Sequence, residues 1–270
     1  MRPTPASAAN GPSTATQNCF TASPIAPGAS CVESLTFSPL TAGPATGTLT
    51  FTDDSGGGSG ATQQVPLTGT ATKAASTASI DSVSPNPAIA GQPVTVAFTV
   101  AAQAGVSLVP SGTVTVQAST GESCTGIAPS GSCALTFANA GDRTITASYA
   151  GSVSFMPSVS SAVSVKIVNF TVAVSPATQS INGKKATYTL TISGLNGFAG
   201  TVSLACSGGP ANTACSVNPA SVTLSASAAT APAKATVTLP NGAPIGTYTF
   251  TFTGTFSGVA RTATATLTVK

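Results

Sequence analysis

The stretch GQPVTVAFTV at residues 91–100 decides the fold class of this chain. Apolar side chains occupy every second position from Val94 to Val100, with Thr or Ala between them. Because successive side chains of a strand point to opposite faces, this alternation is typical of a half-buried β-strand. The stretch GKKATYTLTI at residues 183–192 repeats the pattern, which indicates a second copy of the same β-rich unit.

Further short alternating runs follow in the same order in both copies. Residues 112–116 correspond to 200–204, and residues 144–149 correspond to 247–252. The Ser-Pro steps that open the two copies are offset by 91 residues, or 176 minus 85. About seven short runs per copy, separated by turn residues, predict an antiparallel two-sheet β-sandwich.

Composition places the domain boundaries. Residues 1–17 are Pro, Ser, Thr, Ala, Asn and Gly without periodicity, which predicts a flexible tail. Residues 18–71 contain only three convincing strand-like runs, whereas a closed sandwich needs about seven, so we predict an incomplete first module. The remaining predicted segments are a linker at 72–79, a second module at 80–167 and a third module at 168–270.

Six cysteines form three close pairs, one in each predicted module. The pairs are Cys19 with Cys31, Cys124 with Cys133, and Cys206 with Cys215, separated by 12, 9 and 9 residues. An even count at matching short spacings favours three disulfides over free or metal-binding thiols. Zinc is disfavoured because the sequence has no histidine and no C-x-x-C pair. Since disulfides persist mainly outside the cytosol, we predict an extracellular or cell-surface protein.

The first residues, MRPTPA, lack the apolar stretch of a signal peptide, although an exported chain needs an export signal. We therefore expect this chain to be a piece of something longer. No apolar run reaches the roughly 20 residues that cross a bilayer, so no membrane insertion is predicted. The net charge is +3 without a basic stripe or an aromatic platform, which argues against nucleic acid as a partner.

The second and third modules, residues 80–167 and 168–270, resemble the bacterial Ig-like repeats of large secreted and cell-surface proteins. The stretches GDRTITASYAG at 141–151 and FMPS at 155–158 resemble the terminal hairpin of that family. Residues 18–71 are similar to the C-terminal half of hydin-type Ig-like domains, through motifs such as GTLT at 47–50 and LTGT at 67–70. The resemblance implies an all-β fold of tandem Ig-like antiparallel β-sandwiches with the first module incomplete.

The sequence offers little catalytic chemistry. Without histidine, neither a Ser-His-Asp nor a Cys-His arrangement can be built. A glycosidase needs two facing carboxyl groups, and the six carboxylates show no obvious pair. They are Glu33, Asp53, Asp54, Asp81, Glu122 and Asp142. We therefore predict that the chain is not an enzyme and has no catalytic residue, metal site or cofactor.

Some polar residues have a plainer explanation than a binding site. Asp53 and Asp54 precede a Gly-rich turn, which predicts a solvated hairpin tip rather than a calcium site. Lys184 and Lys185 predict a solvated turn, with anion binding as the lesser alternative. Tyr149 and Tyr248 lie late in their modules, where a buried ring with a tethered hydroxyl is common.

The function that the residues support is mechanical. Residues 165–170 join the second and third modules without Gly or Pro, so we expect a stiff joint there and an easier bend at residues 71–79. This organisation predicts a spacer, an adhesin stalk or a fibre subunit. The strands missing from the first module are explained by truncation, or by another subunit that donates strands and so builds a fibre.

Two alternatives to a structural role stay open. Exposed loops such as residues 101–111 or 193–199 would recognise a surface glycan or protein, although a chain with no Trp and only three Tyr offers few rings on which sugars stack. The chain would otherwise be an accessory region of a larger secreted enzyme. The sequence does not identify the ligand, the oligomeric state or the route of export.

Overall fold

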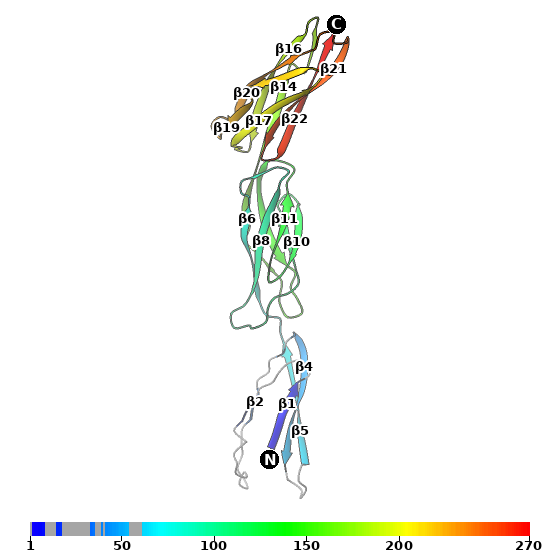
Figure 1. Ribbon diagram of the computed structural model, residues 1–270. Coiled ribbons are helices and arrows are strands. Elements are labelled where there is room, and N and C mark those ends of the chain that lie inside the picture. Colours follow the sequence, from blue (N-terminus) through cyan, green and yellow to red (C-terminus); the bar gives the residue numbers. More distant parts are fainter. Residues whose placement is uncertain (1, 9–14, 18–32, 36–38, 40, 54–60) are drawn as a thin grey trace.

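The computed structural model of the chain describes residues 2–8, 15–17, 33–35, 39, 41–53 and 61–270. Every regular element within these residues is a β-strand, which confirms the all-β prediction. No helix that could span a membrane is found among them. The strands form an N-terminal unit, a central sandwich and a C-terminal sandwich that follow one another along an elongated molecule (Figure 1).

The central sandwich consists of two sheets that enclose one core, and their strands pair antiparallel except for β7, which pairs parallel with β14. Its strands are β6 (Ser76–Ser84), β7 (Ala88–Ile89), β8 (Pro93–Ala102), β9 (Thr113–Ala118), β10 (Ser123–Ile127), β11 (Ser130–Thr136), β12 (Gly141–Tyr149), β13 (Ser158–Val159) and the first half of β14 (Val163–Ser175). One sheet has the order β11-β8-β6, and the other has the order β10-β9-β12-β14, with β13 beside β12. The strand predicted at residues 91–100 is confirmed, because the alternating residues Val94, Val96, Phe98 and Val100 are each at most 1% exposed.

The C-terminal sandwich has the same two-layer construction. Its strands are the second half of β14, β15 (Thr178–Ile181), β16 (Lys185–Leu195), β17 (Gly200–Gly208), β18 (Ala214–Asn218), β19 (Ser221–Leu224), β20 (Thr230–Thr238), β21 (Gly246–Phe256) and β22 (Val259–Val269). Its sheets have the orders β14-β16-β20-β18 and β15-β22-β21-β17-β19. Tyr188 of β16 packs on Phe252 of β21 across the core, with ring centroids 5.2 Å apart.

The N-terminal unit contains a three-stranded and a two-stranded sheet in its described part. Its strands are β1 (Arg2–Ala8), β2 (Ala15–Gln17), β3 (Glu33–Leu35), β4 (Gly43–Asp53) and β5 (Ala61–Ala71), in the orders β1-β4-β5 and β2-β3. The predicted Cys19–Cys31 pair and the turn after Asp53 lie outside the described residues.

The flexible tail predicted for residues 1–17 is wrong for the residues that form β1 and β2. Strand β1 pairs antiparallel with β4, from Arg2 opposite Thr52 to Ala8 opposite Gly47. Main-chain pairing needs no apolar alternation, so composition gave no sign of this strand. Pro3 and Pro5 are compatible with it because β1 is an edge strand, where a missing N–H is tolerated.

The linker predicted at 72–79 is shorter in the structure, because residues 76–79 belong to β6. Small alternating Ala and Ser residues concealed this strand, in which Ala78 is only 5% exposed. Of the remaining linker residues, Ala74 is also held in place. The Ala74 N–H donates to the Ser154 carbonyl, and the Met156 N–H donates to the Ala74 carbonyl, both over 2.8 Å.

Candidate functional site

Two of the predicted cysteine pairs are disulfides in the structure. Cys124 of β10 is bonded to Cys133 of β11, and Cys206 of β17 is bonded to Cys215 of β18, with Cα atoms 5.8 and 5.9 Å apart. In each case the two strands belong to different sheets of one sandwich. Each disulfide therefore clamps the two layers together along one side.

The tyrosines differ in how their hydroxyl groups are satisfied. Tyr149 is fully buried and donates to the Ser111 carbonyl over 2.7 Å, as expected. Tyr248 donates to the Pro244 carbonyl over 2.7 Å, but its ring is only half-buried. Tyr188, which no sequence motif singles out, is 1% exposed. Among the described residues its hydroxyl forms no hydrogen bond of ordinary geometry, but the Gln179 side chain lies near enough to oppose the effect of burial on its pKa. Burial raises the pKa of this phenol.

The carboxylates of the central sandwich have local partners. Asp81 accepts hydrogen bonds from Ser79 and Thr99, over 3.0 and 2.6 Å. A hydrogen bond from the Thr120 hydroxyl holds the pKa of Glu122 below its usual value. Within the described part of the chain, no three His, Cys, Asp or Glu side chains gather closely enough to hold a metal ion.

A group of long-range side-chain hydrogen bonds lies at the junction between the two sandwiches, which strand β14 crosses without a break. Its residues 163–167 pair with β12 of the central sandwich, and its residues 169–175 pair with β16 of the C-terminal sandwich. Ile167 packs in the central core, and the next residue, Val168, packs in the C-terminal core. The short strand β7 strengthens this point, because Ile89 pairs with Val168 and also packs in the C-terminal core.

Arg261 of β22 fastens the junction on one side. Its Nε donates to Asn169 Oδ1 over 3.0 Å, and its Nη2 donates to the Ala90 carbonyl over 2.8 Å. The guanidinium also lies 6.0 Å from the centre of the Phe170 ring. The planar guanidinium, with donors that diverge in fixed directions, can reach both sandwiches at once, which a lysine cannot do with the same geometry.

Asn196 fastens the junction through a turn of the C-terminal sandwich. Its Nδ2 donates to Asp142 Oδ1 over 2.9 Å and to the Ile167 carbonyl over 3.0 Å. Asn196 and Gly197 both have positive φ, 55° and 75°, which Asn and Gly adopt more readily than other residues. This backbone conformation belongs to the turn between β16 and β17, which carries the Asn196 amide at the junction.

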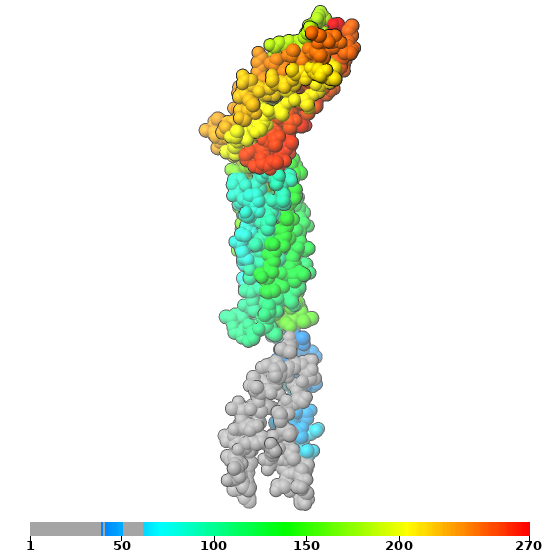
Figure 2. Space-filling view, viewed as in Figure 1, coloured from blue at the N-terminus to red at the C-terminus, as the bar shows by residue number. Residues whose placement is uncertain are grey.

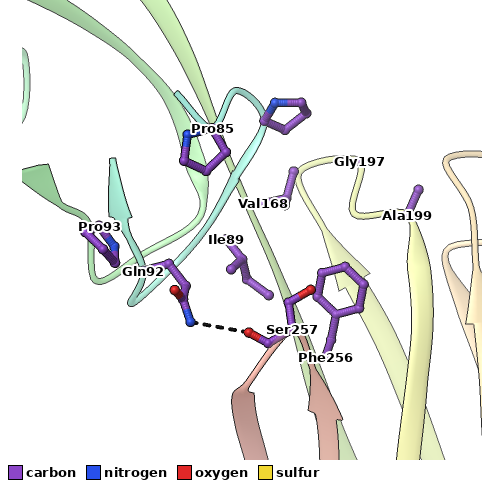
Figure 3. Close-up of a pocket in the computed structure, with 10 residues that line it drawn as sticks. Pro85, Ile89, Gln92, Pro93, Val168, Gly197, Ala199, Phe256 and Ser257 are labelled. Atoms are coloured by element: carbon purple, nitrogen blue, oxygen red, sulfur yellow. Dashed lines mark hydrogen bonds between the residues drawn. The ribbon is translucent and has the colours of Figure 1, made fainter. Parts of the chain in front are cut away.

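A cleft of about 490 Å³ opens beside these contacts (Figure 3). Apolar side chains make up most of its wall, including Pro85 and Ile89 from the central sandwich and Val168 and Phe256 at the C-terminal side. Gln92 Nε2 donates to the Ser257 carbonyl across it over 3.4 Å. No titratable side chain lines the cleft, so it offers an apolar contact surface rather than acid–base chemistry.

The two loops expected to be free for recognition differ in the structure. In residues 193–199 Asn196 bonds to the central sandwich and Phe198 is 1% exposed, whereas Leu195, Gly197 and Ala199 are exposed, so only part of this loop is free. The loop at 101–111 is mostly exposed, with Val109 at 67%. Sequence reasoning missed the junction contacts because each joins residues far apart in the chain.

Comparison with known proteins identifies the type of domain in the middle of the chain. Residues 81–168 match the bacterial Ig-like domain (group 3) family. The predicted Ig-like resemblance is thus confirmed for the central sandwich, and the two-sheet architecture agrees with it. Among curated proteins, none matches the sequence.

Solved structures align with the chain at low similarity. They include Escherichia coli α2-macroglobulin activated by porcine elastase (12% identity, 89% of this chain and 26% of that chain, TM-score 0.31). Three N-terminal domains of the bacteriophage RB49 highly immunogenic outer capsid protein align at 14% identity, over 72% of this chain and 59% of that chain, with a TM-score of 0.32. An endo-fucoidan hydrolase from glycoside hydrolase family 107 aligns at 16% identity, over 97% and 39%, with a TM-score of 0.27. The chain spans between 26% and 59% of the length of these proteins.

Proposed function

We propose that this chain is a structural Ig-like array, outside the cell or on its surface, that acts as a stiff spacer or stalk. In this proposal residues 168–270 are a second Ig-like repeat after the matched domain, and residues 18–71 are part of a hydin-type module. The two disulfides and the bacterial Ig-like match favour an extracellular or cell-surface setting.

The observation that carries the proposal is the unbroken strand β14 with side-chain contacts on both sides of it. A flexible interdomain linker exposes its main chain and has few contacts across the boundary. Here the boundary residues Ile167 and Val168 are buried, and Arg261 and Asn196 bond across them. Bending at this point would break hydrogen bonds and expose apolar surface, so the two sandwiches should move as one body.

Residual dipolar couplings of the two sandwiches in the intact chain test the proposal. A stiff spacer gives the same alignment tensor for residues 80–167 and 168–270. Residues 72 and 73, which lie between β5 and the main-chain hydrogen bonds of Ala74, should allow larger motion of the N-terminal unit. Independent tensors for the two sandwiches, or larger motion at residues 168–170 than at residues 72 and 73, would refute the spacer role.

Self-association is a second candidate, favoured by the outer edge of β5. This 11-residue strand pairs with β4 on one side and with no strand on the other, among the residues that the structure describes. Strand β1 already occupies the other edge of β4, so a donated strand would add to β5. Pro66 weakens such pairing because it has no N–H group. A proline in a sheet normally turns its nitrogen away from the existing partner strand, here β4, so the missing N–H lies on the open edge of β5.

Sedimentation velocity over a range of concentrations tests self-association. If strands add at β5, the variant Gln64→Pro/Thr68→Pro should remain monomeric at concentrations where the original chain polymerises. Gln64 and Thr68 lie two residues before and after Pro66, so their N–H groups also face the open edge, and the variant removes both of them. An original chain that is monomeric at every concentration would exclude the fibre role while leaving the spacer role intact.

A further inference from the structure

Every charged side chain in residues 168–270 is a cation. These are Lys184, Lys185, Lys234, Arg261 and Lys270, which give this segment a charge of +5. All six carboxylates lie before residue 168, where they outnumber the four remaining cations, so residues 1–167 carry −2 and the whole chain carries +3. The molecule is therefore electrostatically polar along its length, and its C-terminal sandwich attracts anions.

Three of the lysines lie at the end of the C-terminal sandwich that is far from the junction. Lys185 opens β16, whose last residue, Leu195, pairs with Asn169 at the junction about 35 Å away. The Lys270 N–H donates to the Ile181 carbonyl over 3.0 Å, three residues before Lys184 in the chain. The chain end (red) and the turn that precedes β16 (lime green) meet at this tip (Figure 2).

Lys234 extends this group of cations along the outer face of one sheet. It lies on β20 between Thr189 of β16 and Asn218 of β18, and it is exposed. Lys185 on the same face pairs with Thr238, four residues beyond Lys234 on β20, so the two lysines are about 13 Å apart along the strands. Exposed Thr and Ser hydroxyls between them can donate hydrogen bonds to the same anionic partner.

No Asp or Glu side chain of the same sandwich neutralises these ammonium groups. The C-terminal sandwich contains no Asp or Glu, and Lys184 donates instead to the neutral amide oxygen of Asn241. The other sheet provides a contrast, because strands β21 and β22 face solvent with paired threonines such as Thr249 and Thr266. The C-terminal sandwich therefore attracts anions on one side, at the β16–β20 face and the tip.

We propose that the β16–β20 face and the tip of the C-terminal sandwich bind a polyanionic polysaccharide, through Lys184, Lys185, Lys234 and Lys270. This role goes beyond that of a spacer. A single small anion cannot bridge lysines 13 Å apart, whereas a polymer with carboxylate or sulfate groups at regular intervals can. Nucleic acid fits less well, because the large aromatic side chains of this sandwich are buried or half-buried and leave no ring for a base to stack on.

Binding of the intact chain to immobilised dextran sulfate and polygalacturonate, with uncharged dextran as the reference, tests this inference. We expect binding to the two polyanions and none to dextran, and we expect it to weaken as salt is raised because exposed charges are screened. Lys185→Gln/Lys234→Gln should weaken binding by about tenfold. Lys73→Gln/Lys166→Gln, which removes the same charge from exposed positions elsewhere, should change it less than about twofold.

Three outcomes would overturn the proposal. They are equal loss of affinity in both double variants, binding to uncharged dextran, and binding to duplex DNA as tight as to dextran sulfate. Amide chemical shifts of the unmodified chain give a second measurement that needs no variant. On addition of a sulfated oligosaccharide, the shifts should concentrate at residues 182–189 and 234–239, and shifts confined to other residues would contradict the assignment. Binding of only one of the two polyanions would identify the anionic group that the face prefers.

Discussion

Arg261 Nη2 donates a hydrogen bond to the Ala90 carbonyl over 2.8 Å, and these two residues are 171 positions apart in the chain. The same side chain donates to Asn169 on the strand that both sandwiches share. One guanidinium therefore fixes the C-terminal sandwich to the central sandwich and to their common strand.

Replacement of Arg261 should loosen the junction without unfolding either sandwich. Arg261→Ala removes both hydrogen bonds and the contact with Phe170, for an expected loss of about 1–3 kcal/mol in the docking of the two sandwiches. Arg261→Lys should recover little of it, because an ammonium cannot reproduce the geometry of the guanidinium. Small-angle X-ray scattering and interdomain dipolar couplings would measure the wider angular spread. An unchanged spread would show that β14 alone sets the stiffness.

Asn196→Asp should destabilise the junction in a pH-dependent way. The change removes the amide donor and places a carboxylate against Asp142 and the Ile167 carbonyl, with an expected cost of about 1–2 kcal/mol at neutral pH. Protonation of the introduced carboxyl group relieves the repulsion, so the cost should shrink at acid pH.

Asn212→Asp is the matched control for this change. Asn212 also has a positive φ, 64°, in a turn of the C-terminal sandwich. That sandwich contains no Asp or Glu to repel the introduced carboxylate. Chemical denaturation of both variants from pH 3 to pH 7 makes the comparison. Equal effects at both sites would mean that the turn conformation, and not the junction, is responsible.

Two tyrosine substitutions should have opposite effects. Tyr149→Phe loses a hydrogen bond and leaves the Ser111 carbonyl without this donor, so it should cost about 1 kcal/mol. Tyr188→Phe removes a buried hydroxyl that forms no hydrogen bond of ordinary geometry among the described residues, so it should be neutral or stabilising by up to about 1 kcal/mol. Calorimetry of the two variants would measure both effects, and a large loss in Tyr188→Phe would point to an ordered water on that hydroxyl.

Tyr188 should also make the C-terminal sandwich sensitive to alkali. Burial raises the pKa of this phenol in the folded state, so ionisation above about pH 10 favours the unfolded chain. The stabilising effect of the neutral phenol is fully present below the pKa that Tyr188 has in the unfolded chain. It is lost as the pH rises through the higher pKa that Tyr188 has in the folded chain. Denaturation curves from pH 8 to pH 11 should fall less steeply in Tyr188→Phe. The same slope in both proteins would assign the alkaline loss to other groups.

Each disulfide should stabilise its own sandwich. By the chain-entropy model, a link across 9 residues contributes about 2.5 kcal/mol, so Cys124→Ala/Cys133→Ala should destabilise the central sandwich by roughly that amount. Cys206→Ala/Cys215→Ala should do the same to the C-terminal sandwich. Amide hydrogen exchange resolved by residue would separate the two effects. Mass mapping of unreduced peptides would test the Cys19–Cys31 pair, and crossed partners would contradict the arrangement of one link per module.

Local pattern was a reliable guide where side chains alternate between core and solvent. The stretches around Phe98 and Tyr188 were predicted as strands because large apolar residues recur at every second position, and both residues are buried. No such alternation of large apolar residues marks β1 or the first residues of β6, where pairing depends on the main chain or on small residues such as Ala78. Main-chain hydrogen bonding is common to all residue types, so composition does not report it.

The sequence by itself determined the all-β class, the repetition of one sandwich-like unit and the pairing of the cysteines in the two sandwiches, since alternation, repeats and short spacings are properties of neighbouring residues. Only the tertiary structure decided that each of these disulfides joins two sheets, that one strand serves both sandwiches, and that Arg261 and Asn196 hold them together. It also gathered Lys184, Lys185, Lys234 and Lys270 on one face and tip. The physical reason is that such contacts depend on how distant strands pair in space, which the short-range order of the side chains does not encode.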